Sequence, residues 1–375
     1  YAVIDFLWYR KYVDGAYTDS YGFDNIDEWG RPFPDLQMFP SSGVDRGFSQ
    51  ISSKVHRIGL KFGIHLMKGI SVQAVNANTP ILDIKTGKPY LEDGRQWTAR
   101  DIGLTQRTCA WMPHGFMSVN TDTGAGRAFL RSLYRQYAGW GVDFVKVDCI
   151  FGTDYSPEEI ITISELLQEI DRPIILSLSP GTEVTPALAE NISNHVNMYR
   201  ITGDDWDNWN DVSSHFSVAS SFSAAKKIGA TGLRGRSWPD LDMLPFGWLT
   251  DPSNELPLYK EIKIVFIPVL LCVNQGPHRK CNLTIDEQKT QMALWSMAKS
   301  PLMYGGDLRH LDDGTLNIIT NPTLLKINHY SKNNMEVLAL MWELNVNGNL
   351  VSSYSGLCAT MESRAKQGTH YVALL

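Results

Sequence analysis

The segment Val142-Asp-Phe-Val-Lys-Val-Asp148 is an apolar run that ends in a carboxylate, and a helix-like stretch and a second apolar run follow it. Ser156-Pro157-Glu158-Glu159 has the residues of a helix start, with a capping Ser, a Pro in the first turn and a Glu at the third position. Apolar residues then recur at helical spacing up to Ile170, and residues 174–178 form the next apolar run. Strand, helix and strand at this spacing predict a right-handed βαβ unit within a parallel sheet.

The same alternation recurs along most of the chain. Residues 2–8, 60–66 and 301–304 are strand-like, and Thr284 with Glu287 forms a capping box for a helix that continues through Trp295. No GxGxxG motif follows the first strand, so the number of units favours a barrel over a dinucleotide-binding fold. After residue 328, short strands with turns such as Asn347-Gly348 indicate antiparallel β structure. We therefore predict an α/β chain with a (β/α)8 TIM barrel at residues 1–328 and a small antiparallel β domain at residues 329–375.

The charge balance argues against nucleic acid and anionic membranes as partners. The chain has 34 Lys and Arg against 40 Asp and Glu, a net charge of −6, and no basic run. Its longest apolar stretch, residues 264–273, is interrupted by Pro268, whereas about 20 residues are needed to span a bilayer. We expect neither nucleic acid binding nor a membrane span.

Cysteine spacing and two sequons bear on the compartment. The five cysteines, at positions 109, 149, 272, 281 and 358, show no CxxC spacing, which argues against a structural zinc site. Cys109 and Cys149 can form a disulfide or remain buried thiols, and the sequence leaves both open. Asn191-Ile-Ser and Asn282-Leu-Thr are acceptor sites for N-glycosylation. We expect a glycoprotein that is secreted to the extracellular space or cell wall, or is vacuolar or lysosomal, with a signal peptide that is not part of this chain.

Two aspartates are the candidate catalytic groups. Asp148 closes the segment quoted above, and Asp204 closes Val196-Asn-Met-Tyr-Arg-Ile-Thr-Gly-Asp204. A carboxylate at the C-terminal end of a barrel strand points into the mouth of the fold, and a pair of them indicates glycoside hydrolysis. Each could instead be a cap or an ion-pair partner. His56 and His65 lack the spacing of a metal-dependent hydrolase, and residues 204–211 lack the Gly and Glu of an EF-hand loop. We expect no metal and no cofactor.

Six blocks of the sequence, in order, resemble the α-galactosidase (melibiase) family of glycoside hydrolases. They are Ile4-Asp5-Phe6-Leu7-Trp8, Gly59-Leu-Lys-Phe-Gly-Ile64, Val145-Lys-Val-Asp148, Arg200-Ile-Thr-Gly-Asp204, Trp238-Pro-Asp-Leu-Asp-Met-Leu244, and Gln291-Met-Ala-Leu-Trp295 with Pro301-Leu-Met and Asp307-Leu-Arg309. The resemblance implies a (β/α)8 barrel, a C-terminal antiparallel β domain and a retaining double displacement. Asp148 matches the family's nucleophile and Asp204 its acid/base. Lys146 and Arg200 match residues that bind ring hydroxyls, and Asp242 matches the second aspartate of the family's Trp-Asn-Asp-Pro-Asp motif.

Physical reasoning agrees with these roles. In a retaining enzyme the two carboxyl groups lie about 5–5.5 Å apart. Lys146 lies on the same strand face as Asp148, two residues earlier, and would keep that carboxylate ionised. Desolvation and the nearby negative charge would keep a proton on Asp204. Asp205 stands beside Asp204, so the acid/base assignment can shift by one residue.

Departures from the family pattern bear on the substrate. Asp5 and Trp8 match the first acid and the Trp of the family's Ile-Asp-Asp-Cys-Trp block, but Phe6 replaces the second acid. A phenyl ring cannot accept a hydrogen bond from a hydroxymethyl group, and burial of an unpaired hydroxyl costs about 1–3 kcal/mol. β-L-Arabinopyranose is galactose without that group, so Phe6 favours a β-L-arabinopyranosidase as the alternative. His65 replaces a family Tyr, and Ser179 occupies the position that discriminates the C2 substituent, which leaves N-acetylgalactosaminides open.

Other departures concern the completeness of the chain. The family's Gly-Trp-Asn-Ser-Trp strand is absent, so the first βα unit of the barrel is missing, and the C-terminal domain is truncated. Residues 255–275 are apolar without periodicity, and we interpret them as an aberrant insert. The sequence thus predicts a retaining exo-glycosidase that removes terminal α-D-galactosyl residues from oligosaccharides or glycoconjugates. The alternatives are a β-L-arabinopyranosidase and a catalytically impaired sugar-binding fragment.

Overall fold

The computed structural model describes residues 1–5, 7–11, 23–43, 46–228, 237–249, 279–331, 334, 342–344, 350–352 and 358–359. The chain divides into two compact units, Tyr1–Gly203 with Leu249–Arg279, and Asp204–Trp248 with Lys280–Leu375. Phe6 and the insert predicted at residues 255–275 lie outside the described residues. The boundary predicted at residue 328 stays a prediction.

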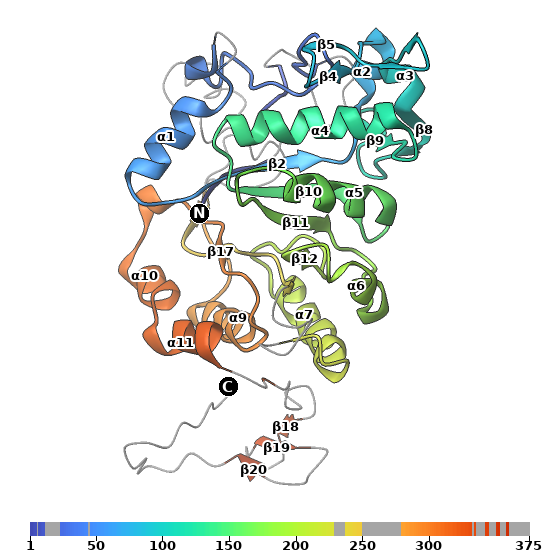
Figure 1. Ribbon diagram of the computed structural model, residues 1–375. Helices are drawn as coiled ribbons and strands as arrows, with labels where there is room; N and C mark the ends of the chain where they lie inside the picture. The colour runs from blue at the N-terminus through green and yellow to red at the C-terminus, as the bar shows by residue number, and fades with distance from the viewer. Residues whose placement is uncertain are drawn as a thin grey trace. The chain divides into compact units, whose positions relative to one another are not determined.

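A parallel sheet forms the centre of the first unit (Figure 1). Five parallel strands lie side by side in the order β1 (Ala2–Ile4), β2 (Phe62–Met67), β10 (Phe144–Phe151), β11 (Ile175–Pro180) and β12 (Met198–Arg200). All six residues of β2 are buried, as are six of the eight in β10. Strands covered on both faces read as near-continuous apolar runs, which is why this segment was recognisable in the sequence.

The predicted βαβ unit is confirmed, and its helix begins at Pro157 as predicted, but the Ser156 side chain makes no cap hydrogen bond. β10 leads into α5 (Pro157–Gln168), and β11 follows. The Ser156 side chain does not cap α5; its hydroxyl accepts a hydrogen bond from Arg107 at 3.2 Å. Glu159 is buried, and its carboxylate accepts the Val119 amide at 3.3 Å. Tertiary contacts have therefore replaced the expected local capping.

The first strand is shorter than the predicted run of residues 2–8. β1 ends at Ile4, and Leu7 adopts a φ of +65°, which extended backbone does not allow. The remaining helices of the first unit are η1 (Pro40–Ser42), α1 (Ser49–Arg57), α2 (Val72–Ala77), α3 (Ala99–Ile102), α4 (Gly124–Gly139) and α6 (Pro186–Ile192). The 16-residue α4 precedes β10 and lies beside α5, and its buried residues Phe129, Leu133 and Tyr137 recur at helical spacing.

An antiparallel excursion between β2 and β10 was not predicted. It contains a three-stranded sheet of β3 (Ile70–Ser71), β9 (Phe116–Val119) and β8 (Gly103–Thr108). Two small hairpins pair β4 (Leu82–Asp83) with β5 (Lys88–Pro89) and β6 (Leu91–Glu92) with β7 (Arg95–Gln96). Their two-residue strands are too short to give a period-two pattern in the sequence.

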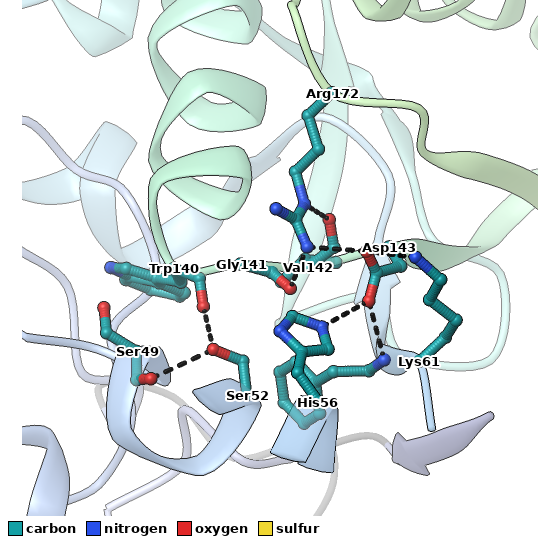
Figure 2. A network of polar contacts seen from close by, with 10 residues as sticks. Ser49, Ser52, His56, Lys61, Trp140, Gly141, Val142, Asp143 and Arg172 are labelled. Atoms are coloured by element: carbon teal, nitrogen blue, oxygen red, sulfur yellow. Dashed lines mark hydrogen bonds and ion pairs between the residues drawn. The ribbon is translucent and has the colours of Figure 1, made fainter. Parts of the chain in front are cut away.

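A polar network closes the N-terminal end of β10 (Figure 2). Asp143, which immediately precedes the strand, accepts hydrogen bonds from His56 at 2.7 Å, the Phe62 amide at 2.9 Å and Arg172 at 2.6 Å. Lys61 lies 3.9 Å from the same carboxylate. Burial alone would raise the pKa of Asp143, but these partners lower it below its ordinary value. The network thus joins α1, the start of β2 and the segment before β11 to the start of β10.

The second unit combines helices with short strands. Its helices are α7 (Trp209–Ala224), α9 (Ile285–Met297), η6 (Leu308–His310), α10 (Asp313–Ile319) and α11 (Pro322–Tyr330). β13 (Trp238–Asp240) precedes β14 (Met243–Leu244), which pairs in parallel with β17 (Met303–Tyr304). The strands β15 (Trp248–Leu249) and β16 (Arg279–Lys280) each contain a boundary between the two units in the sequence.

Two sequence predictions for the second unit are confirmed. Thr284 and Glu287 form the reciprocal capping box at the start of α9. Beyond residue 328, β18 (Trp342–Leu344), β19 (Leu350–Ser352) and β20 (Cys358–Ala359) form an antiparallel sheet, whereas the predicted Asn347-Gly348 turn lies outside the described residues. Within the described part of the chain, no helix has the length and apolarity needed to cross a bilayer.

Candidate active site

One face of the parallel sheet carries most of the candidate residues of the first unit. Lys146 pairs in register with His65 on β2 and with Ser177 on β11, so these three side chains share a face. Residues two positions further along a strand lie on the same face, which adds Asp148 on β10 and Ser179 on β11. By the same rule Arg200 shares the face of Met198, the partner of Ser177. The C-terminal ends of the strands thus gather a carboxylate, two cations, an imidazole and hydroxyls.

Asp148 is held in its ionised form by its neighbours. Its side chain is 13% exposed, and one carboxylate oxygen lies 3.1 Å from Nε2 of His65. The other oxygen accepts the Cys149 amide at 2.5 Å. Burial would raise the pKa of Asp148, but the hydrogen bond and charge of His65, followed by the charges of Lys146 and Arg200, lower it to about 2. Lys146 acts in the predicted direction, and His65 acts more strongly.

His65 lies beside the candidate nucleophile. It is 3% exposed and contacts the carboxylate of Asp148, and its role in substrate binding stays a prediction. Arg200 is also buried, and its Nε–H donates to the carbonyls of Pro180 at 2.5 Å and Thr202 at 3.1 Å. These bonds fix the guanidinium relative to the strand ends, which is what a substrate-binding cation requires.

Ser179 and Trp8 differ sharply in what they offer a substrate. Ser179 is fully buried, and its hydroxyl has no hydrogen-bond partner among the described residues, so it can still accept or donate one. Trp8 is also fully buried, but its indole N–H donates to the His65 carbonyl at 2.7 Å, and Phe48 and Trp140 pack against its ring. The Trp8 ring is thus part of an aromatic core, and its role as a substrate-binding residue stays a prediction.

The family block that contains Trp8 has two other candidate residues. Asp5 follows β1 and is exposed. Phe6 lies outside the described residues, so its proposed effect on substrate choice rests on the sequence alone.

A disulfide joins the loop before β9 to the strand of Asp148. Cys109 and Cys149 are bonded, with their Cα atoms 5.4 Å apart, which decides between the two alternatives that the sequence left open. Asp154 lies beside both sulfur atoms, but the disulfide occupies the thiols that a metal would need. Cys149 directly follows Asp148 and has a φ of +58°, so the bond fixes an unusual backbone position next to the carboxylate.

Asp204 and Asp242 belong to the second unit, and the structure distinguishes Asp204 from its neighbour. Asp204 is exposed, whereas Asp205 is fully buried. The Asp205 amide donates to the carboxylate of Asp242 at 2.8 Å, and the side-chain amide of Gln291 binds the Asp205 carboxylate. Asp205 is thus a structural group, which leaves Asp204 as the accessible acid. The expected desolvation of Asp204 is wrong, since this residue is exposed.

The sequence named Asp205 only as an alternative to Asp204, and it assigned no role to Gln291. Gln291 stood within a matched block, but nothing in the one-dimensional pattern shows which residue its amide reaches. The positive φ of Asp242, +82°, was a second unforeseen feature. An aspartate tolerates this conformation better than most residues do, which offers a weak sequence signal for a turn there.

Comparisons with known proteins support one family. A family model described as Alpha galactosidase A (Melibiase_2) matches residues 279–330. The α-galactosidase of Cyamopsis tetragonoloba is 28% identical over 306 residues, which cover 81% of this chain and 52% of that protein. The chain spans about half to two thirds of the length of the curated relatives it matches.

Two solved structures are more similar still. A GH27 β-L-arabinopyranosidase from Geobacillus stearothermophilus is 35% identical with a TM-score of 0.69, covering 87% of this chain and 67% of that one. An enzyme from Bacillus halodurans described as a putative α-N-acetylgalactosaminidase is 34% identical with a TM-score of 0.66, covering 88% and 68%. Together with the ionised Asp148 at the strand ends, these matches show that the chain belongs to the α-galactosidase (melibiase) family of glycoside hydrolases, GH27.

Proposed function

We propose that the protein is a retaining exo-glycoside hydrolase that removes terminal α-D-galactosyl residues from oligosaccharides or glycoconjugates. The observation that carries the proposal is Asp148, a carboxylate whose pKa is lowered to about 2 on a sheet face that also holds Lys146 and Arg200. A nucleophilic carboxylate must be ionised at the working pH, and this environment ensures it. Family membership supplies the reaction class.

The proposed reaction has two displacements. Asp148 attacks the anomeric carbon, and Asp204 gives its proton to the leaving oxygen as the glycosidic bond breaks. The product of this step is a glycosyl ester of Asp148 with the aglycone released. Asp204, now ionised, removes a proton from water, which attacks the same carbon and frees the sugar with its original configuration. Lys146, Arg200 and Ser179 would bind ring hydroxyls, and Asp5 would bind the far end of the sugar.

The finer features of the fold belong to the same proposal. We propose that the parallel strands are part of a (β/α)8 barrel, which an antiparallel β domain follows after residue 328. The two structures above 30% identity support a common fold. The disulfide and the sequons favour a secreted, vacuolar or lysosomal glycoprotein, because such bonds persist in oxidising compartments.

A β-L-arabinopyranosidase is the second candidate. Phe6 stands where the family has an acid that binds the hydroxymethyl group, and a solved structure at 35% identity is described as an enzyme of this specificity. A pocket without a hydroxyl-binding partner loses its preference for the sugar that carries the hydroxyl. Ser179 and the neighbour described as a putative α-N-acetylgalactosaminidase make the 2-acetamido sugar a substrate to include in the test.

The test compares nitrophenyl α-D-galactopyranoside, β-L-arabinopyranoside and N-acetyl-α-D-galactosaminide with wild type and Phe6→Asp. We expect hydrolysis of the galactoside, and an increase of about 10-fold or more in the ratio of galactoside to arabinopyranoside kcat/KM in Phe6→Asp. An unchanged ratio would remove Phe6 as a specificity residue. Inactivity of the wild type on all three sugars would contradict the proposed function and support the sugar-binding alternative.

A further inference from the structure

The peptide unit that follows Asp204 is fixed from one side. Its N–H belongs to Asp205 and donates to a carboxylate oxygen of Asp242 at 2.8 Å. Because a peptide unit is planar, this bond also fixes the carbonyl carbon of Asp204 and limits its backbone rotation. The Asp205 side chain points into the unit, where it is fully buried, and the exposed Asp204 lies immediately before it. The orientation of Asp204 therefore depends on what holds Asp205 and Asp242.

Helix α9 holds both residues through two side chains on one face. Gln291 and Trp295 are four residues apart, so they are neighbours on the helix surface, and both are fully buried. The Gln291 amide nitrogen donates to the Asp205 carboxylate and, at 3.3 Å, to the carbonyl of Met243. The Trp295 indole N–H donates to the Asp242 carbonyl at 2.8 Å.

Asp242 is held at a strained backbone position by further bonds. Its φ of +82° is uncommon for a residue with a side chain. Its own amide donates to the Asp240 carboxylate at 2.9 Å, which together with the Trp295 bond satisfies both of its main-chain groups. A strained residue that is bonded on every side suits a rigid support for its neighbours.

We propose that Gln291 is a positioning residue for the acid/base Asp204, acting through Asp205, with Trp295 supporting the same loop through Asp242. This inference rests on the proposed function, in which Asp204 protonates the leaving group. Gln291 does not touch the reacting atoms; its amide keeps Asp205 buried and the following peptide plane fixed. A displacement of about 1 Å at a catalytic group can lower a rate about 100-fold.

The test uses Gln291→Glu, which replaces the donating amide by a carboxylate facing buried Asp205. A misplaced acid slows substrates with poor leaving groups most, because activated leaving groups need less protonation. We expect kcat to fall about 100-fold for the phenyl glycoside and about 10-fold or less for the nitrophenyl glycoside, with little change in KM. The ratio of the two rates is independent of the fraction of protein that folds.

Gln288→Glu is the matched control. Gln288 lies on the same helix and is buried, but its amide donates to the Leu283 carbonyl at 2.8 Å and does not reach Asp205. We expect this variant to lose stability without changing the phenyl to nitrophenyl ratio. A second comparison, Gln291→Glu with Asp205→Asn, restores one hydrogen bond with donor and acceptor exchanged and should recover about 10-fold or more of the lost kcat.

The outcomes separate this inference from the proposed function. A leaving-group-dependent loss in Asp204→Ala and in Gln291→Glu, with recovery in the exchanged pair, supports both. If Asp204→Ala shows that dependence and Gln291→Glu lowers both substrates equally, Gln291 is a folding residue and the positioning role is overturned. If Asp204→Ala shows no such dependence, Asp204 is not the acid, and the proposed function and this inference fail together.

Discussion

Replacing His65 by Leu should shift the acid limb of the pH profile, because His65 is the main group that keeps Asp148 ionised. The pKa of Asp148 is lowered from its ordinary 3.8 to about 2, a difference worth about 2.5 kcal/mol. Burial opposes this shift, so losing the 3.1 Å hydrogen bond and the charge of His65 should raise the pKa by about one to two units.

The assay is kcat/KM for a nitrophenyl glycoside between pH 2 and 7, which reports groups of the free enzyme. At pH 3 a carboxyl with a pKa of about 2 is roughly 90% ionised, and one with a pKa of about 4 is roughly 10% ionised. A pKa raised to between about 3 and 4 therefore predicts a loss of about two- to ninefold at pH 3 that disappears near pH 6. His56→Leu is the matched control, since it removes the 2.7 Å contact with Asp143 at the opposite end of β10. An identical acid limb in wild type and His65→Leu would refute this explanation of the ionised carboxylate.

Three further predictions concern stability. Asp143→Asn should lower the free energy of unfolding by about 1–3 kcal/mol in urea titrations at pH 7. Because folding lowers the pKa of Asp143, its stabilisation is present at a pH above the ordinary pKa and is lost as the pH falls through the pKa of the folded state. This pH dependence of stability should be absent from the variant. Removing the disulfide in Cys109→Ala/Cys149→Ala should cost about 4 kcal/mol for a separation of 40 residues, and a reductant that destabilises wild type should leave the variant unchanged. Burial raises the pKa of Glu159 from 4.5 to about 7, so its contribution to the free energy of unfolding is fully present below pH 4.5 and is lost as the pH rises through 7. Wild type should therefore lose up to about 3 kcal/mol of stability between pH 4.5 and 7, and Glu159→Gln should not. An equal loss of stability in both proteins would contradict the assignment.

The sequence predicted those elements whose signal lies within a few consecutive residues. The buried run at β10 and the capping box of α9 were both identified, because an apolar strand and a Thr–Glu pair are visible in a few consecutive residues. Ser156 and Glu159 had the same kind of pattern, yet their side chains bind Arg107 and the Val119 amide. These partners lie 49 and 40 residues away in the chain, and no local rule includes them.

The candidate site was predicted to a similar degree. Strand-end position and matched blocks brought Lys146, Asp148 and Arg200 to one end of the sheet, where the structure places them. The burial of Trp8 in an aromatic core was not predicted, because a Trp in a matched block can pack in a core as readily as it can stack on a sugar, and burial is a tertiary property. Asp204 and Asp205 were indistinguishable as neighbouring letters, whereas one is exposed and the other buried.

The role of Asp148 as the nucleophile can be tested with the variant Asp148→Ala, nitrophenyl α-D-galactopyranoside as substrate and added azide. The configuration of the product is then determined by NMR. We expect the variant to lose at least about 1000-fold in kcat. Azide should restore activity, because it occupies the space left by the carboxylate and attacks the anomeric carbon from the same side. The product should be the glycosyl azide of inverted configuration, whereas wild type releases galactose with retained configuration. Near-normal hydrolysis by Asp148→Ala without azide would contradict the assignment of Asp148 as the nucleophile.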